Sequence, residues 1–223
     1  MSATTDRDLV CRIASTEPER ALRIARGIAD PWFRCQALSG VAEAENDLKA
    51  RRRLIRESLE AAGEQSEAPP IVMVSAWPLQ VMCRSGWMDE VRTEVARLLA
   101  LIAPEPHAVR RAHAVFELIY RLREGPEDIY PALLDALQAA CLAMPPKAKK
   151  KEWLMRYGVV YAADIAPERA RALAELIHRP NLRREAFAAL ERHEDKASPP
   201  PHGAIDLAPL SRDAVPRSPT AIP

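Results

Sequence analysis

The sequence predicts an all-α protein that folds as a right-handed α-solenoid of about five helical hairpins. The first observation behind this is an internal repeat: residues 18–38 and 167–187 align without a gap and share nine identities in 21 positions. The second is that prolines recur at a regular period along the chain. Self-similarity at a fixed period is typical of proteins that stack copies of one supersecondary unit.

The prolines predict where helices begin, because the ring fixes φ at a helical value and the missing N–H has no partner in the first turn anyway. One helix of each unit should start at a proline, with spacings of 39, 36, 40 and 34 residues: Pro31, Pro70, Pro106, Pro146 and Pro180. Its partner should start near Pro18, Asp47, Gly86, Pro126 and Pro167. A period of about 37 residues is typical of two-helix repeats. A short leading helix is expected over residues 6–14.

The paired helices are expected to bury small apolar faces. Ala21, Ile24, Ala25 and Ile28 follow the spacing i, i+3, i+4, i+7, which places them on one side of a helix. The last copy repeats the pattern with Ala170, Leu173, Ala174 and Ile177. Ala25 and Ala174 should therefore be buried where the helices approach each other. Residues 71–83 are apolar nearly all round, which predicts a helix in the middle of the stack, kinked at Pro78.

Two regions follow from this pattern. Residues 1–193 are expected to form one α-helical repeat domain, and residues 194–223 a disordered, Pro-rich tail without periodicity. The start of the chain lacks the basic and apolar segments of a secretory signal, and its longest apolar run is too short to span a bilayer. The four cysteines are far apart in sequence, as in a protein with reduced thiols. We therefore expect a cytoplasmic protein with no membrane partner.

Three segments of the first unit resemble the degenerate bacterial helical repeats of the TPR and HEAT-like class: Ala21-Leu22-Arg23-Ile24-Ala25, Ile28-Ala29-Asp30-Pro31 and Arg34-Cys35-Gln36-Ala37-Leu38. Proteins of this class are scaffolds that bind other macromolecules on a curved surface. The resemblance therefore implies a non-catalytic scaffold or adaptor with a protein or peptide partner on its concave surface.

The residues themselves offer no catalytic constellation. The sequence has no Gly-rich phosphate loop and no Gly-x-Ser-x-Gly elbow, which are the signatures of phosphate-binding and α/β-hydrolase sites. Glu175 and His178 form the only Glu-x-x-His pair, whereas a di-iron site needs a second copy. We expect no enzyme activity, no cofactor and no metal.

Two basic clusters suggest an alternative function. The first covers residues 49–56 and includes Arg51, Arg52 and Arg53; the second is Lys147, Lys149, Lys150 and Lys151, followed by Trp153, Tyr157 and Tyr161. The three aromatic residues share one helical face, so they are either core or a stacking platform. Cations beside stacking rings are typical of nucleic-acid binding. The alternative to a protein partner, which an acidic segment would suit, is thus nucleic acid bound at 49–56 and 147–151.

Arg34, Arg111 and Arg183 recur at one repeat position. The structural interpretation is that each pairs with an acid of its own hairpin, such as Glu19 or Glu168, and clamps it. The functional interpretation is a ladder of cations along a groove. Their repetition favours the structural interpretation.

Overall fold

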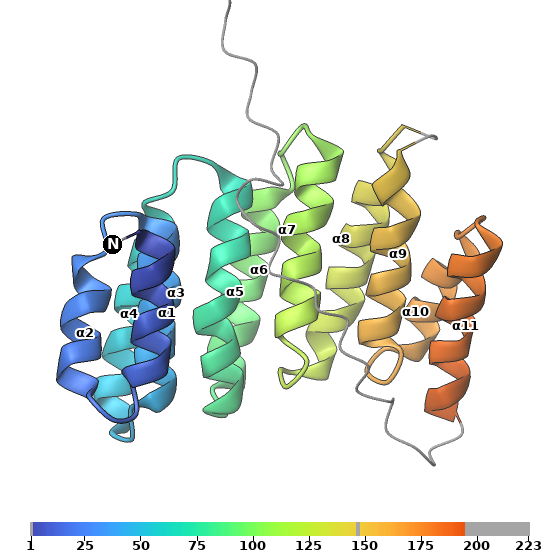
Figure 1. Ribbon diagram of the computed structural model, residues 1–223. Helices are drawn as coiled ribbons and strands as arrows, with labels where there is room; N and C mark the ends of the chain where they lie inside the picture. Colours follow the sequence, from blue (N-terminus) through green and yellow to red (C-terminus); the bar gives the residue numbers. More distant parts are fainter. Residues whose placement is uncertain (1, 146–147, 195–223) are drawn as a thin grey trace, which may run out of the picture.

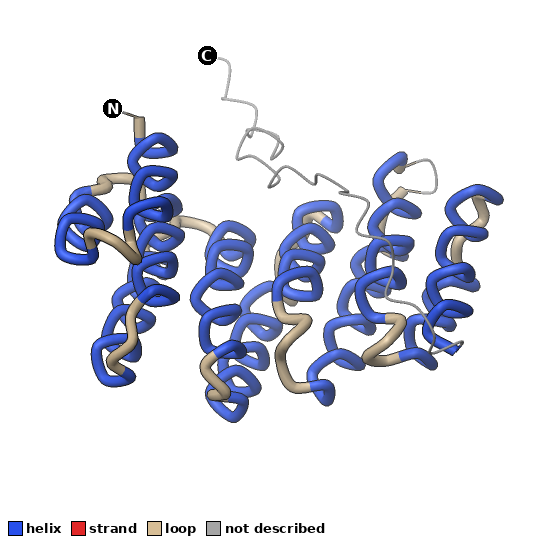
Figure 2. Tube along the Cα trace, turned by 60° about the horizontal axis from the view of Figure 1, so that its bottom comes forward, coloured by secondary structure: helices blue, strands red, loops and turns tan. Residues whose placement is uncertain are grey.

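In a computed structural model, which describes residues 2–145 and 148–194, the chain is a row of helices joined by short loops (Figure 1). No strand occurs in this part of the chain (Figure 2). The helices are α1 (Ala3–Ile13), α2 (Pro18–Gly27), α3 (Pro31–Ala44), α4 (Leu48–Gly63), α5 (Ala68–Arg84), α6 (Met88–Ile102), α7 (Ala108–Arg121), the 3₁₀ turn η1 (Glu127–Ile129), α8 (Tyr130–Leu142), α9 (Lys149–Ala162), α10 (Pro167–Glu175) and α11 (Pro180–Glu194). The predicted all-α class is confirmed.

The helices form two layers. In the odd-numbered layer each helix packs directly against the next, from α1 to α11. The even-numbered helices pack mainly on the odd-numbered helices beside them, and only α8 and α10 make substantial contact with each other. Figure 1 shows α5, α7, α9 and α11 in front of α6, α8 and α10.

Most predicted helix starts are confirmed. Helices α2, α3, α10 and α11 begin at the expected prolines, and α4 begins directly after Asp47, whose side chain accepts a hydrogen bond from the Ala50 N–H at 2.7 Å. Helix α7 begins two residues after Pro106, and η1 separates Pro126 from α8. Pro146 lies outside the described residues.

The leading helix begins earlier than predicted, at Ala3 rather than residue 6. The reason is a local cap: the Ser2 side chain accepts a hydrogen bond from the Thr5 N–H, and a capped first turn stabilises a helix start. Helix α5 continues through Pro78 to Arg84. Two residues after its end, Gly86 has a φ of 75°, a conformation that favours glycine.

The core lies between the layers and depends on small residues. Ala25 and Ala174 are fully buried, as predicted, and so are Ala21, Ala112 and Ala186. Small side chains let helix backbones approach closely. The longest continuous block of buried residues is 112–119 on α7. Helix α5 is also buried along most of its length, because α3, α4, α6 and α7 cover it on several sides.

Among the described helices, none has the length and apolarity needed to cross a membrane. The predicted tail at 194–223 lies outside the described residues, apart from Glu194, which is the last residue of α11.

Candidate functional site

Five aromatic side chains meet where α7 and α9 pack together. We call this cluster the aromatic seam: Phe116 and Tyr120 from α7, and Trp153, Tyr157 and Tyr161 from α9. The Phe116 ring lies 5.7 Å from that of Tyr157 and 6.0 Å from that of Tyr161, between centroids. Trp153 ends the seam, 5.9 Å from Tyr157, and is 40% exposed. The seam is thus buried at its centre and open to solvent at one end.

Helix α9 packs closely on the even-numbered helices at Gly158. Gly158 faces the even-numbered helices, and a Cβ there would lie 2.6 Å from Leu137 Cδ2 and 3.1 Å from Leu173 Cδ2. Helix α9 packs on α8 and α10 around Gly158, and it contacts Phe116 of α7 through Tyr157 and Tyr161. The predicted stacking residues therefore lie at a surface junction between two helices, with Trp153 the most accessible.

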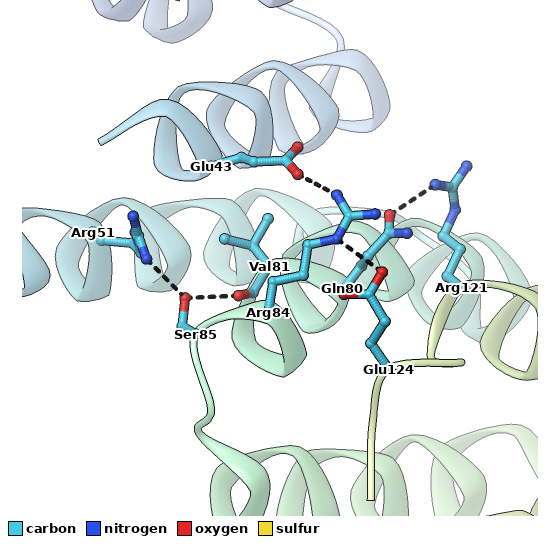
Figure 3. Close-up of polar contacts among 8 residues, drawn as sticks. All are labelled: Glu43, Arg51, Gln80, Val81, Arg84, Ser85, Arg121 and Glu124. Atoms are coloured by element: carbon cyan, nitrogen blue, oxygen red, sulfur yellow. Dashed lines mark hydrogen bonds and ion pairs between the residues drawn. The ribbon is translucent and has the colours of Figure 1, made fainter. Parts of the chain in front are cut away.

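Arg121 extends the seam from α7 to α5. Its guanidinium carbon lies 3.7 Å from the centroid of the Trp77 ring and 5.8 Å from that of Tyr120. The same guanidinium donates to Glu117 at 2.5 Å. It also donates to Gln80 at 3.3 Å, a contact that Figure 3 shows. The Arg121 and Glu117 side chains are only 11% and 12% exposed. A cation held between a carboxylate and an aromatic face is fixed in position and neutralised.

Arg156 extends the seam in the other direction, towards α11. Its guanidinium carbon lies 4.5 Å from the Tyr157 centroid, and Nη2 pairs with Glu185 of α11 at 2.7 Å. Near the other end of α9, Arg123 lies over Tyr161 and pairs with Asp164 at 3.0 Å. The arginines that border the seam therefore already have carboxylate partners, so the accessible chemistry is that of the rings.

His113 lies on α7, one turn before Phe116 and Glu117. It is 7% exposed, and burial, with a smaller contribution from the Lys150 charge, lowers its pKa to about 4. The imidazole is therefore neutral at pH 7.

Two lysines of the predicted cluster, Lys150 and Lys151, have described side chains, and their charges act on different neighbours. The charge of Lys150 acts on His113 of α7, whereas that of Lys151 acts on Cys141 of α8. Lys147 lies outside the described residues, and Lys149 is the first residue of α9.

The first basic cluster lies on α4, in the even-numbered layer. The Arg52 guanidinium donates to Glu90 at 2.8 Å and lies 4.3 Å from the Trp87 ring centroid, which ties α4 to α6. Arg53 is exposed, and the described residues provide it with no partner. Helices α5 to α8 separate this cluster from α9, so the two basic clusters do not share a surface.

Arg51, the third arginine of that cluster, is part of the framework. Its Nε donates to the backbone carbonyl of Glu45, six residues earlier, at 3.0 Å. Its Nη1 donates to Ser85 at 3.2 Å, and the Ser85 hydroxyl donates to the Val81 carbonyl at 2.8 Å (Figure 3). Arg51 thereby joins the ends of α3 and α5.

Arg34 and Arg111 make the same backward contact as Arg51. Arg34 donates to the Ile28 carbonyl at 3.1 Å and pairs with Glu64, and Arg111 donates to the Glu105 carbonyl at 2.8 Å. Each of these arginines is the fourth residue of its helix and reaches the carbonyl six residues earlier. We call this contact the arginine clamp.

The expected acid partners of these arginines were wrong. Neither Glu19 nor Glu168 pairs with the repeated arginine of its hairpin; Arg34 and Arg111 donate to backbone carbonyls, and Arg183 lies over the Phe187 ring at 5.5 Å. The physical reason is proximity. The carbonyls at the end of the preceding segment lie close to the fourth residue of the helix, and no N–H group of a helix donates to them.

Arg84 makes a second junction in the same region, between the C-terminal ends of α3 and α5 and the loop after α7. It pairs with Glu43, and its Nε donates to Glu124 at 3.3 Å (Figure 3). Because Arg84 is 40% exposed, solvent screens these ion pairs, which orient the helix ends more than they stabilise them.

Sequence reasoning did not single out Phe116, Glu117, Arg121, Trp77 or Arg156. The spacing of Glu117 and Arg121 at i, i+4 was a usable signal for an ion pair on one helical face. The contact of Arg121 with Trp77 joins residues 44 positions apart, and no local pattern indicates it.

Glu175 and His178 are both exposed, and within the described residues no three His, Cys, Asp or Glu side chains converge as a metal site would require. Comparison with family models, with curated proteins and with solved structures gives no match to this chain. Its function must therefore be inferred from the geometry of its own residues.

Proposed function

We propose that this chain is a right-handed α-solenoid of the TPR/HEAT-like class, acting as a non-catalytic scaffold that binds a protein or peptide segment on the odd-numbered layer. The observation that carries this proposal is the aromatic seam, in which Trp153 is exposed beside two partly buried tyrosines. Trp, Tyr and Arg are the residues most enriched at the energetic centres of protein interfaces.

The packing of the layers supports the choice of face. Each odd-numbered helix contacts the next odd-numbered helix along the whole row, whereas most even-numbered helices make little contact with one another. In a curved stack the helices are closest on the inner side, so this packing supports the odd-numbered layer as the concave side of the proposed solenoid. Concave surfaces built by stacked repeats are the usual place for an extended partner.

The electrostatics favour a protein partner over nucleic acid. Arg51 and Arg52 contact carbonyl, hydroxyl and carboxylate groups of the chain itself, which leaves fewer cations for phosphates. Nucleic-acid binding needs several phosphate contacts at once, and the two basic clusters lie on different layers.

The test selects peptides from a random library on the full-length chain and then measures their affinity for variants. Trp153→Ala should weaken binding at least tenfold, about 1.4 kcal/mol. Trp87→Ala is the matched control, because Trp87 lies at the start of α6 in the other layer and should leave affinity unchanged.

Two results would contradict the proposal. One is a set of selected peptides that bind Trp153→Ala and the parent equally well. The other is submicromolar binding of an oligonucleotide at physiological salt that Lys150→Ala and Arg53→Ala weaken, which would establish the nucleic-acid alternative instead.

A further inference from the structure

The rings of the seam carry unused hydrogen-bond donors. Tyr130, which is fully buried, donates its hydroxyl to the Ile119 carbonyl at 3.3 Å. Within the described residues, by contrast, the hydroxyls of Tyr157 and Tyr161 and the indole N–H of Trp153 have no partner of this kind. Polyproline II ligands bind to aromatic rings that offer a flat apolar face and a free hydrogen-bond donor. The proline rings of the ligand stack on the aromatic faces, and its backbone carbonyls accept hydrogen bonds from the donors.

The chain contains such a ligand directly after its last helix. Residues 195–223 include seven prolines, and three of them are consecutive in Ser198-Pro199-Pro200-Pro201. Consecutive prolines fix φ near the polyproline II value, so this conformation costs little entropy to adopt.

The length of the seam matches this segment. Trp153 and Tyr161 are eight residues apart on α9, which is about 12 Å along the helix. A polyproline II chain advances about 3.1 Å per residue, so four residues also cover about 12 Å. Ser198–Pro201 is four residues long.

The segment also lies within reach. Helices α9 and α11 pack side by side and run in the same direction (Figure 1), so α11 ends at Glu194 on the side of α9 where Tyr161 lies. Three residues lie between Glu194 and Ser198, and these four steps along the chain span at most about 14 Å, whereas packed helices are about 8–10 Å apart.

Charge does not oppose this occupant. The arginines around the seam are paired with Glu117, Glu185 and Asp164, and the four-residue segment is uncharged. An acidic ligand would have to compete with those carboxylates, but a proline segment would not.

We propose that Ser198–Pro201 docks on the aromatic seam as a polyproline II segment, so that the chain occupies its own binding surface until a partner displaces it. This inference rests on the proposed function of the seam. A tethered segment has a millimolar effective concentration, which is sufficient to mask a surface of modest affinity.

The test measures binding of a labelled peptide with the sequence of residues 195–204 to three full-length chains. In one, Pro199, Pro200 and Pro201 are changed to Gly; in the matched control, Pro209, Pro216 and Pro219 are changed to Gly. The peptide should bind the first variant about tenfold more tightly than it binds the parent or the control, because only the first variant has lost the tethered competitor. Equal affinity for all three chains would overturn the proposal.

Two further substitutions, made in the first variant, locate the peptide. Trp153→Ala should abolish its binding, and Tyr157→Phe, which keeps the ring and removes the hydroxyl, should weaken it about fivefold. Thermal unfolding of each variant shows whether it is folded. If library peptides bind through Trp153 but the 195–204 peptide does not bind, self-occupation is wrong and the proposed function stands. If neither binds through Trp153, both are wrong.

Discussion

At the scale of single residues, His113 is a base that folding keeps uncharged. Burial lowers its pKa from an ordinary value of 6.5 to about 4, with Lys150 adding to the effect. In the unfolded chain the imidazole takes up a proton below pH 6.5, whereas in the folded chain it does so only near pH 4. The unfolded state therefore binds more protons between these values, and stability falls as the pH is lowered through that window.

We expect the free energy of unfolding to fall by about 1–3 kcal/mol between pH 7 and pH 4.5 on account of this residue. Urea unfolding of the parent and of His113→Gln at both pH values isolates the contribution, because other groups titrate alike in the two proteins. His178→Gln is the control, since His178 is exposed. An identical pH dependence in the parent and His113→Gln would show that the imidazole is not held neutral.

At the scale of helices, the arginine clamp recurs at the start of α3, α4 and α7. A guanidinium at the fourth residue supplies donors to carbonyls at the end of the preceding segment, which lack helical partners. The clamp fixes the angle between consecutive helices in both layers. Arg51 belongs to this set, which makes its role in the basic cluster a structural one.

Arg111→Ala should lower the free energy of unfolding by about 1.5–3 kcal/mol, the usual contribution of a hydrogen bond with a charged donor. Arg53→Ala, which removes an exposed arginine, should change it by less than about 0.5 kcal/mol. Urea midpoints measure both. If the two variants unfold at the same urea concentration, the clamp contributes nothing.

At the scale of the whole molecule, the four cysteines lie on helices that extend from one end of the row to beyond its middle. Cys11 is exposed on α1, while Cys35, Cys83 and Cys141 are buried on α3, α5 and α8. Burial raises the pKa of these three thiols to about 12, about 11 and about 12 respectively. The thiolate is the reactive form, so both access and ionisation protect them.

A chromogenic disulfide reagent at pH 8 should therefore modify one thiol rapidly in the native protein and the other three far more slowly. In denaturant all four should react at once. Cys11→Ser should remove the fast phase and leave the slow ones unchanged. Two or more fast thiols in the native protein would mean that the layers open readily.

Several helix starts could be predicted from sequence because they depend on neighbouring residues. Pro18, Pro31, Pro167 and Pro180 each begin a helix through the geometry of one ring, and the buried Ala25 and Ala174 follow from the helical period.

The candidate site could be predicted only in part. The spacing of Trp153 and Tyr157 indicated a shared face, but whether that face is core or surface depends on Phe116 of α7, about 40 residues earlier in the chain. The partners of Arg34 and Arg111 could not be predicted, because a long side chain chooses among acids and carbonyls by distances that arise only after the helices pack. The burial of the aromatic face and the partners of these arginines are both determined by tertiary packing.

The sparse contact between α6 and α7 has a mechanical consequence. The half of the molecule that ends with α6 and the half that begins with α7 are joined chiefly through the packing of α5 on α7 in one layer. A change in the angle between α5 and α7 would change the distance between Trp77 and Arg121, which stack at 3.7 Å across this junction. Because this cation–π pair joins α5 to α7, a segment that inserts beside Trp77 would break it and loosen the junction between the two halves.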